Sequence, residues 1–259
     1  MRRSLYALIL GCALLTGCST PVPGDDAPGT VFVGSWNLQR YGDAKANDTA
    51  MLERYATVVR DFDVFVVQEV TDKDGDAFAK LCVAVGENYS CLLSSRAGTT
   101  SYKEQYGVFV RDGIVVVDTV DYNERNASGF ERPPYRIALN KSGYAFTLYT
   151  LHTKPDNTPA EIDALERIVE DSGNVIILGD LNADCSYYRR GNDFPSWKWT
   201  ISSDTTAGKS DCAYDRILLN KDMAREYRNA GVLRVGGDKI SDHNAVWVAL
   251  HSRDRKGWW

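Results

Sequence analysis

The stretch from Val175 to Cys185 constrains the fold of this chain more than any other. It reads Val-Ile-Ile-Leu-Gly-Asp-Leu-Asn-Ala-Asp-Cys, so a β-branched and aliphatic run ends abruptly in a cluster of short oxygen-bearing side chains. Such a run is typical of a strand buried on both faces, and Gly179 permits the chain to leave the strand sharply. Taken alone, the polar cluster fits an Asx-rich turn; the rest of the sequence makes it a candidate site.

The N-terminus is typical of an export signal. Two arginines begin the chain, residues 5–15 are apolar, and the segment Leu-Thr-Gly-Cys ends at Cys18. The apolar run is too short for a comfortable transmembrane helix. We therefore predict a signal peptide over residues 1–17. Because Leu-Thr-Gly-Cys resembles the bacterial lipoprotein signal, we also predict a lipid anchor on Cys18; the alternative is simple secretion with Cys18 unmodified.

The rest of the chain has the composition of an ordinary globular protein, with 259 residues in all, 44% of them hydrophobic and 25% charged. Residues 18–29 contain three prolines and no apolar periodicity, which predicts a flexible tether. We expect a single folded domain over residues 30–252. The tail over residues 253–259 ends in two tryptophans and is either frayed or a surface patch.

The charge balance argues against simple electrostatic attraction to a polyanion. Without residues 1–17, the chain has 28 basic and 35 acidic residues, which gives a net charge of −7. Nucleic-acid binding by such a chain has to depend on local basic and hydrogen-bonding groups and on metal ions that reverse the sign of the charge at the site.

Four cysteines remain when the signal peptide and Cys18 are set aside, and an even number in an exported chain suggests two disulfides. The local pairings are Cys82 with Cys91 and Cys185 with Cys212. Their loops of 10 and 28 residues would contribute about 2.7 and about 3.6 kcal/mol by the chain-entropy relation. No group of cysteines and histidines has the spacing of a zinc site.

Apolar patterns predict an α/β fold. Apolar residues at helical spacing predict helices within residues 51–59, 77–85 and 158–169. Buried or alternating runs predict strands at residues 30–33, 64–67, 106–110, 114–120, 144–151, 175–178, 213–219 and 245–250. Because hairpins mix with strand-helix-strand units, we expect two mixed, mostly antiparallel sheets packed face to face and flanked by helices, in a four-layer sandwich.

Two local motifs make sharper predictions. Asp112-Gly113 lies between two predicted strands and is a strong hairpin signal. Thr158-Pro159-Ala160-Glu161 has the pattern of a capping box, with proline at the first helical position. A cap of this kind contributes about 1 kcal/mol.

Carboxylates and amides lie at or next to the ends of several predicted strands. These residues are Asn37, Glu69, Asp180, Asn182 and Asp242. A lone carboxylate at a strand end is usually a turn former, yet this many hard-oxygen ligands suit a site for Mg²⁺, which keeps waters and takes one or two carboxylates.

Histidine is scarce, and its positions sharpen the prediction. Of the three histidines, His152 ends a strand, His243 follows Asp242, and His251 lies near the C-terminus. A single histidine at a strand end is more often structural, but two that can each be matched to a carboxylate suit acid-base chemistry. Hydrolysis of a phosphodiester needs a base for the water and an acid for the leaving oxygen, both titrating near neutrality.

Five segments carry a resemblance. They are SYKEQY (101–106), LHT (151–153), GDLNADCSY (179–187), DCAYDR (211–216) and ISDH (240–243). Together they resemble the deoxyribonuclease I family of the endonuclease/exonuclease/phosphatase superfamily, and the likeness runs in order from about residue 31 to residue 250. NADCSY and CAYDR are specific to this branch, whereas QEV (68–70) and SDH are shared more widely.

The resemblance implies a catalytic nuclease domain with a divalent metal, Mg²⁺ or Mn²⁺. The implied metal ligands are Asn37, Glu69, Asp180 and Asp242. The implied catalytic groups are Asp180 and Asn182 at the scissile phosphate and two pairs, His152 with Glu104 and His243 with Asp215. In each pair the carboxylate would fix the tautomer of the imidazole and stabilise the imidazolium.

The resemblance also implies substrate contacts and structural elements. The implied substrate-binding residues are Tyr102, which would pack against a DNA sugar in the minor groove, Arg132, which would bind phosphate, Ser210 and Tyr214. The pairing of Cys185 with Cys212 matches a long disulfide of the family. Asp204 and Thr206 match part of a structural Ca²⁺ site.

Three departures from the family pattern concern DNA contact and calcium. Gln39 and Thr71 stand where relatives carry arginines that contact DNA, which puts affinity for the minor groove in doubt but not the chemistry. Residues 122–130 contain no cysteine, so a small second disulfide of the family is absent, and with it a second Ca²⁺ site is in doubt. Cys82 with Cys91 would be a replacement elsewhere.

We therefore expect an exported, monomeric endonuclease that cuts DNA, preferably double-stranded and without sequence specificity, and that meets a membrane only through its lipid anchor. One alternative is a superfamily phosphodiesterase that acts on a phospholipid head group, as a sphingomyelinase does. Another is a catalytically silent binding module, which predicts the loss of at least one ligand, and none is lost.

Overall fold

The computed structural model describes residues 22–24, 29–125, 127–189, 191–208, 210–235, 237 and 239–251. The predicted signal peptide, the lipidation site Cys18 and the tail over residues 253–259 lie outside these residues, as does most of the predicted tether. Within the described part of the chain, no helix has the length and apolar character needed to cross a membrane.

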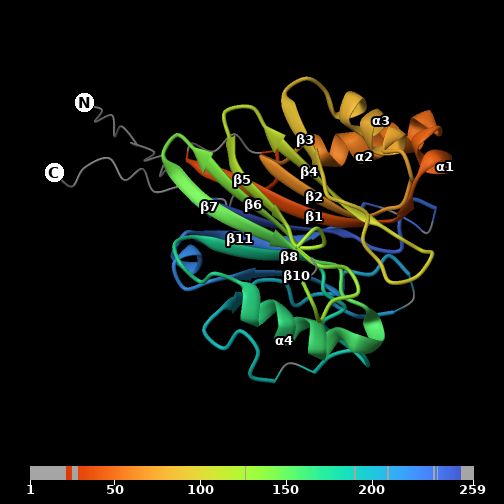
Figure 1. Ribbon diagram of the computed structural model, residues 1–259. Coiled ribbons are helices and arrows are strands. Elements are labelled where there is room, and N and C mark those ends of the chain that lie inside the picture. The colour runs from red at the N-terminus through yellow and green to blue at the C-terminus, as the bar shows by residue number, and fades with distance from the viewer. Residues whose placement is uncertain are drawn as a thin grey trace, which may run out of the picture.

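Among the described residues, two six-stranded sheets form the centre of the molecule (Figure 1). The first contains, in spatial order, β11 (Tyr227–Leu233), β12 (Ala245–His251), β1 (Thr30–Tyr41), β2 (Val64–Val70), β4 (Gln105–Arg111) and β3 (Tyr89–Leu93). The second contains β5 (Val115–Asp121), β6 (Tyr135–Lys141), β7 (Tyr144–Thr150), β8 (Val175–Asp180), β10 (Asp215–Leu219) and β9 (Lys198–Trp199). Only β1–β2 and β7–β8 are parallel pairs among these strands, so the sheets are mixed and mostly antiparallel, as predicted.

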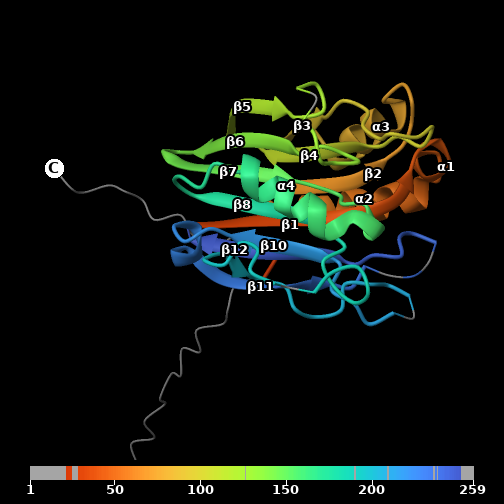
Figure 2. The ribbon, with the colours of Figure 1, turned by 60° about the horizontal axis from the view of Figure 1, so that its bottom comes forward.

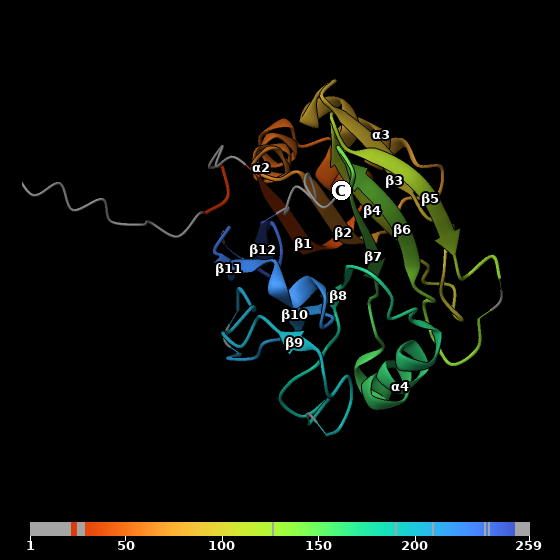
Figure 3. The same ribbon diagram turned by 90° about the vertical axis from the view of Figure 1, so that its left-hand side faces the viewer.

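Helices cover the outer faces of both sheets. They are α1 (Asp43–Ala46), α2 (Thr49–Arg60), α3 (Asp76–Val85) and α4 (Thr158–Ile168), with the 3₁₀ turns η1 (Pro155–Asn157) and η2 (Met223–Arg225). Successive residues of a strand face different layers. In β1, Val31 faces the core between the sheets, whereas Phe32 faces a second core under α2 and α3. A third core lies under α4, which crosses β7 and β8 (Figure 2). The predicted four-layer sandwich is confirmed (Figure 3).

The predicted hairpin at Asp112-Gly113 is wrong. The turn itself forms, since Ile114 N donates to Arg111 O over 3.2 Å. However, β4 already pairs with β2 on one side and β3 on the other, so it has no free edge for β5. β5 crosses instead to the second sheet and pairs with β6. The turn therefore links the two sheets rather than two neighbouring strands.

The predicted capping box is also wrong. Thr158 is already helical, with φ −47° and ψ −49°, because η1 leads directly into α4, and its hydroxyl donates to Lys154 O over 3.2 Å. Glu161 does not bond back to Thr158. Its fully buried carboxylate accepts hydrogen bonds from the backbone N–H groups of Glu131 (3.1 Å) and Lys154 (3.3 Å). Glu161 therefore joins two loops that flank the candidate site.

Candidate active site

The first strand bulges where its polar residues begin. The register between β1 and β2 shifts between Asn37 and Tyr41, so β1 continues past Asn37 instead of ending there as expected. Within this bulge Gln39 and Arg40 have φ angles of 50° and 54°, and Glu69 of β2 has a φ angle of 59°. Such angles cost non-glycine residues about 1–3 kcal/mol each and cluster at functional sites.

The ends of β7 and β8 approach each other closely. Gly179 has a φ angle of 143°, and a Cβ at this position would lie 2.1 Å from the carbonyl oxygen of Leu151. Only glycine permits both this backbone conformation and this contact. The close approach brings His152, which follows Leu151, next to Asp180 at the end of β8.

Both predicted histidine–carboxylate pairs are formed in the structure. His152 Nδ1 lies 3.1 Å from Glu104 Oε2, and His243 Nδ1 lies 2.7 Å from Asp215 Oδ2. The Nε2 atoms of both histidines face one oxygen, Asp180 Oδ2, at 3.4 and 3.5 Å. Asp180 thus lies between the two pairs. A group reacting with an acid on one side and a base on the other would have to lie at this same place.

Burial and charge act in opposite directions on these groups. Burial lowers the pKa of His243, but Asp215 and Asp180 raise it overall, to about 10. Burial likewise lowers the pKa of His152, and Glu104 and Asp180 reverse the effect, so this pKa is also raised. Burial raises the pKa of Asp180, but the two histidines lower it overall. The site therefore favours imidazolium groups beside an ionised carboxylate.

Asn37 joins two of the carboxylates. Its Nδ2 donates to Glu69 Oε1 and to Asp180 Oδ2, both over 2.9 Å, and its Oδ1 accepts from Gln39 N over 2.8 Å. Because both ends of the amide have protein partners, Asn37 orients Glu69 and Asp180. Its role as a metal ligand stays a prediction.

Glu69 presents an ionised carboxylate at the same place. Its Oε2 accepts from Arg40 N over 2.9 Å and from the Tyr102 hydroxyl over 3.0 Å. Burial raises the pKa of Glu69, but His152 and the hydrogen bonds that this carboxylate accepts lower it overall.

An open cavity of about 830 Å³ adjoins these groups. Five of the predicted site residues line it: Glu69, Tyr102, Arg132, His152 and Asp242. Glu69 and Asp242 offer carboxylate oxygens to this single space, and the Asp242 side chain is 54% exposed. Hard oxygen donors facing open solvent are what Mg²⁺ prefers, so these residues fit a divalent cation.

Arg132 and Asn182 are both fastened to the segment that follows β7. Arg132 donates from Nε to His152 O (2.9 Å) and from Nη2 to Thr153 O (2.7 Å), and its Nε also lies 2.6 Å from Glu104 Oε1. Asn182 Nδ2 donates to Thr153 O over 3.0 Å. The structure therefore brings both predicted phosphate-binding groups beside the first histidine pair.

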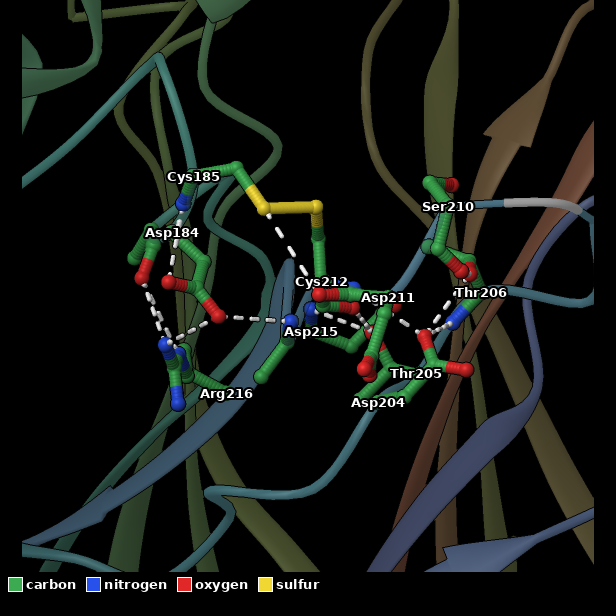
Figure 4. The surroundings of a disulfide bond; sticks show 12 residues. Asp184, Cys185, Asp204, Thr205, Thr206, Ser210, Asp211, Cys212, Asp215 and Arg216 are labelled. Carbon is green, nitrogen blue, oxygen red and sulfur yellow. Dashed lines mark hydrogen bonds and ion pairs between the residues drawn. A yellow bond between two sulfur atoms is a disulfide. The ribbon is translucent and has the colours of Figure 1, made fainter.

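Both predicted disulfides are present, Cys82–Cys91 and Cys185–Cys212. The second ties the loop after β8 to the loop before β10, and Figure 4 shows Asp184 and Arg216 beside it. It holds Tyr214, whose ring centroid lies 6.4 Å from that of His243, near the second pair. Two disulfides fit a protein exported to an oxidising compartment.

The segment around Asp204 is closed by hydrogen bonds. Asp204 Oδ1 accepts from Thr206 N (2.9 Å), Thr206 Oγ1 (2.7 Å) and Cys212 N (3.2 Å), and Thr206 Oγ1 also donates to Ser210 O (2.6 Å; Figure 4). Thr206 forms an isolated bridge with His243, so the segment packs against the second pair. Ser210 itself is exposed. The Ca²⁺ site and the substrate contact of Ser210 stay predictions.

Sequence reasoning missed Lys45 of α1. Its Nζ donates to the backbone carbonyls of Leu38 (2.7 Å), Gln39 (2.5 Å) and Ile240 (2.7 Å). Lys45 thus ties the bulge of β1 to the loop that carries Asp242. No motif could have indicated this role, because the partners of Lys45 are backbone atoms brought together only by the fold.

The sequence profile of the Endonuclease/Exonuclease/phosphatase family matches residues 34–243, a span that includes both histidine pairs and the cavity. The chain belongs to this family. Family membership makes it a hydrolase of the nuclease and phosphodiesterase class.

Curated relatives place the chain beside deoxyribonuclease I. Deoxyribonuclease-1 of Gallus gallus is 32% identical over 263 residues, which cover 86% of this chain and 93% of the relative. Deoxyribonuclease-1-like 2 of Mus musculus is 34% identical, over 73% of this chain and 76% of the relative. Deoxyribonuclease gamma of Homo sapiens is 31% identical, over 71% of this chain and 70% of the relative. The resemblance to the deoxyribonuclease I family is therefore confirmed.

Solved structures show the same fold at lower identity. An endonuclease/exonuclease/phosphatase family protein from Bacteroides thetaiotaomicron superposes with a TM-score of 0.63 at 17% identity, covering 85% of this chain and 94% of that one. Truncated TDP2 of Caenorhabditis elegans gives a TM-score of 0.60 at 18% identity, covering 86% and 97%. At these identities the likeness concerns the fold alone.

Proposed function

We propose that this protein is a metal-dependent endodeoxyribonuclease that hydrolyses DNA to 5′-phosphate and 3′-hydroxyl ends. The observation that carries the proposal is the convergence of His152 Nε2 and His243 Nε2 on Asp180 Oδ2, next to an open polar cavity. The three relatives described above are all deoxyribonucleases, which supports DNA as the substrate.

The two histidine pairs would divide the proton transfers. One histidine, which has to be in its neutral imidazole form, would take a proton from the attacking water, and the other, as the imidazolium, would give a proton to the leaving oxygen. Glu104 and Asp215 each bind the Nδ1 atom of one histidine. Both Nε2 atoms, which face Asp180, would then exchange protons with the water and the leaving oxygen. Acid-base catalysis of this kind contributes about 10²–10⁴-fold to the rate.

Glu69 and Asp242 would hold the divalent cation, Mg²⁺ or Mn²⁺, with Asn37 and Asp180 beside them. The bound ion would stabilise negative charge that develops on the phosphate. Around it, Arg132 and Asn182 would hold the phosphate oxygens. Tyr102, which lines the cavity, and Tyr214, which lies beside His243, would contact the DNA. A Ca²⁺ ion at Asp204 and Thr206 would stabilise the loop that packs against His243.

The cellular setting is part of the proposal. We propose that residues 1–17 are removed, that Cys18 is lipidated in a bacterial cell envelope, and that the domain acts as a monomer on double-stranded DNA. The two disulfides support an exported chain. Mass spectrometry of the membrane fraction would show a diacylated or triacylated N-terminal Cys18; an unmodified Cys18 in the soluble secreted fraction would contradict the anchor.

A substrate panel tests the function. The chain without its first 17 residues, carrying Cys18→Ser to prevent lipidation, is incubated with plasmid DNA, RNA and sphingomyelin, in Mg²⁺ with or without Ca²⁺ or in chelator. We expect plasmid cleavage that chelator abolishes. Cleavage that persists in chelator would contradict the metal role, and sphingomyelin turnover without DNA cleavage would favour the phospholipid alternative.

A further inference from the structure

Four arginine and lysine side chains line the cavity beside the candidate active site: Arg40, Lys45, Arg132 and Lys239. Two of them already have several protein partners. Lys45 donates to three backbone carbonyls, and Arg132 is buried against Glu104 and the carbonyls of His152 and Thr153. Arg40 and Lys239 are exposed, and neither forms an ion pair with the residues that the structure describes.

Arg40 differs from Lys239 in being held in place. Its backbone N–H donates to Glu69 Oε2, and its φ angle of 54° fixes the bulge of β1 from which its side chain leaves. Its guanidinium Cζ lies 5.8 Å from the centre of the Tyr102 ring, within range of a cation–π contact. The Arg40 guanidinium is therefore held beside a carboxylate of the candidate metal site, and no described residue neutralises it in an ion pair.

The Tyr102 ring is itself a fixed support. Its hydroxyl donates to Glu69 Oε2 over 3.0 Å, the same oxygen that receives the Arg40 N–H. The loop that carries Tyr102 is fastened by Thr99, whose N–H and hydroxyl donate to the Glu131 carboxylate over 2.7 to 2.8 Å. Arg40 and Tyr102 therefore form a preorganised pair on one wall of the cavity.

We propose that Arg40, supported by the Tyr102 ring, binds a backbone phosphate of the DNA strand next to the cleavage site and sets the affinity of this enzyme for DNA. The inference rests on the proposed function. Residues 18–259 carry a net charge of −7, so DNA binding by this part of the chain depends on local cations such as Arg40. Gln39, which lines the same cavity, is neutral, so Arg40 supplies the charge for the contact.

The test compares Arg40→Ala with wild type and with Arg54→Ala, which removes an exposed arginine on α2 that does not line the cavity. Plasmid nicking is measured at several DNA and salt concentrations. For Arg40→Ala we expect the KM for DNA to rise about tenfold while kcat changes less than twofold, because a charge-assisted phosphate contact is lost. The slope of log(kcat/KM) against log[salt] should become shallower by about 0.9. Arg54→Ala should match wild type.

Two rescue variants separate a phosphate contact from a structural role. Arg40→Lys should keep the salt slope of wild type. Gln39→Arg in the Arg40→Ala background should lower the KM most of the way back to the wild-type value, since Gln39 lines the same cavity.

Unchanged KM and salt slope in Arg40→Ala would overturn the inference while wild-type nicking upholds the proposed function. A fall in kcat without a change in KM would also overturn it, because the bulge rather than the charge would then matter. If wild type does not cut DNA at all, both proposals fail.

Discussion

Asp180 is the residue on which the geometry of the site depends. Its Oδ2 accepts a hydrogen bond from the Asn37 amide and lies within 3.5 Å of the Nε2 atoms of both histidines. Its Oδ1 accepts a hydrogen bond from the N–H of Asn182 over 3.1 Å. The side chain is only 2% exposed, so these contacts are made with little competition from water. Sequence patterning indicated Asp180 as the polar end of a buried strand but gave no sign that it lies between two histidines.

The charge on His243 should make stability depend on pH. Its pKa is raised from the ordinary value of 6.5 to about 10, so the folded state binds the proton more tightly than the unfolded state. The resulting stabilisation is complete below pH 6.5 and is lost as the pH rises toward 10, by at most about 1.4 kcal/mol per pH unit. Urea unfolding in chelator should therefore show a larger stability difference between wild type and His243→Gln at pH 6 than at pH 9.5. A difference that does not change with pH would contradict the ion pair.

At the scale of elements, most of the buried strands were predictable, whereas three of the four edge strands of the described sheets were missed and only the edge strand β5 was predicted. The strands β1, β2, β4, β7, β8 and β12 are almost entirely buried runs, and each was predicted within a few residues apart from the extension of β1. The edge strands β3, β9 and β11 were missed because most of their residues are partly exposed and show no clean alternation. β6 lies inside its sheet and alternates between buried and half-buried residues, yet it was also overlooked.

The two wrong local predictions have a common physical cause. A turn or cap motif depends on a few neighbouring residues only. Whether a strand has a free edge, or a side chain a free acceptor, depends on contacts with residues far away in the sequence. The Asp112-Gly113 turn forms, but β3 already occupies the edge of β4 that a hairpin would need. The Glu161 carboxylate does not cap the helix because it accepts hydrogen bonds from the N–H groups of Glu131 and Lys154 in two neighbouring loops.

Glu161 should therefore contribute to stability through loop anchoring. Glu161→Ala would remove the carboxylate that accepts from the N–H groups of Glu131 and Lys154 in two partly buried hydrogen bonds, and a hydrogen bond to a charged group contributes about 1.5–3 kcal/mol. Urea unfolding should show a loss of about 2 kcal/mol or more, whereas Asp163→Ala, an exposed change on the same helix, should lose less than about 0.5 kcal/mol. Equal stability of the two variants would show that solvent reaches these N–H groups.

At the scale of the whole molecule, the site exists only where the two sheets meet. Asn37 and Glu69 come from β1 and β2 of the first sheet, whereas Asp180 and Asp215 come from β8 and β10 of the second. The core between the sheets sets the distance between these groups, so no spacing in the sequence encodes it. The pairing of His152 with Glu104 was accordingly predicted through family resemblance and not from the pattern of residues.

The central claim is that His152 and His243 together perform the acid-base chemistry of DNA cleavage, and plasmid nicking in Mg²⁺ tests it most directly. His251 supplies a matched control, since it ends β12 away from both pairs. We predict that His152→Ala and His243→Ala each lower the nicking rate by about 10²–10⁴-fold while circular dichroism shows an intact fold, and that His251→Ala cuts at the wild-type rate. Near-normal nicking by folded His152→Ala or His243→Ala would contradict the account.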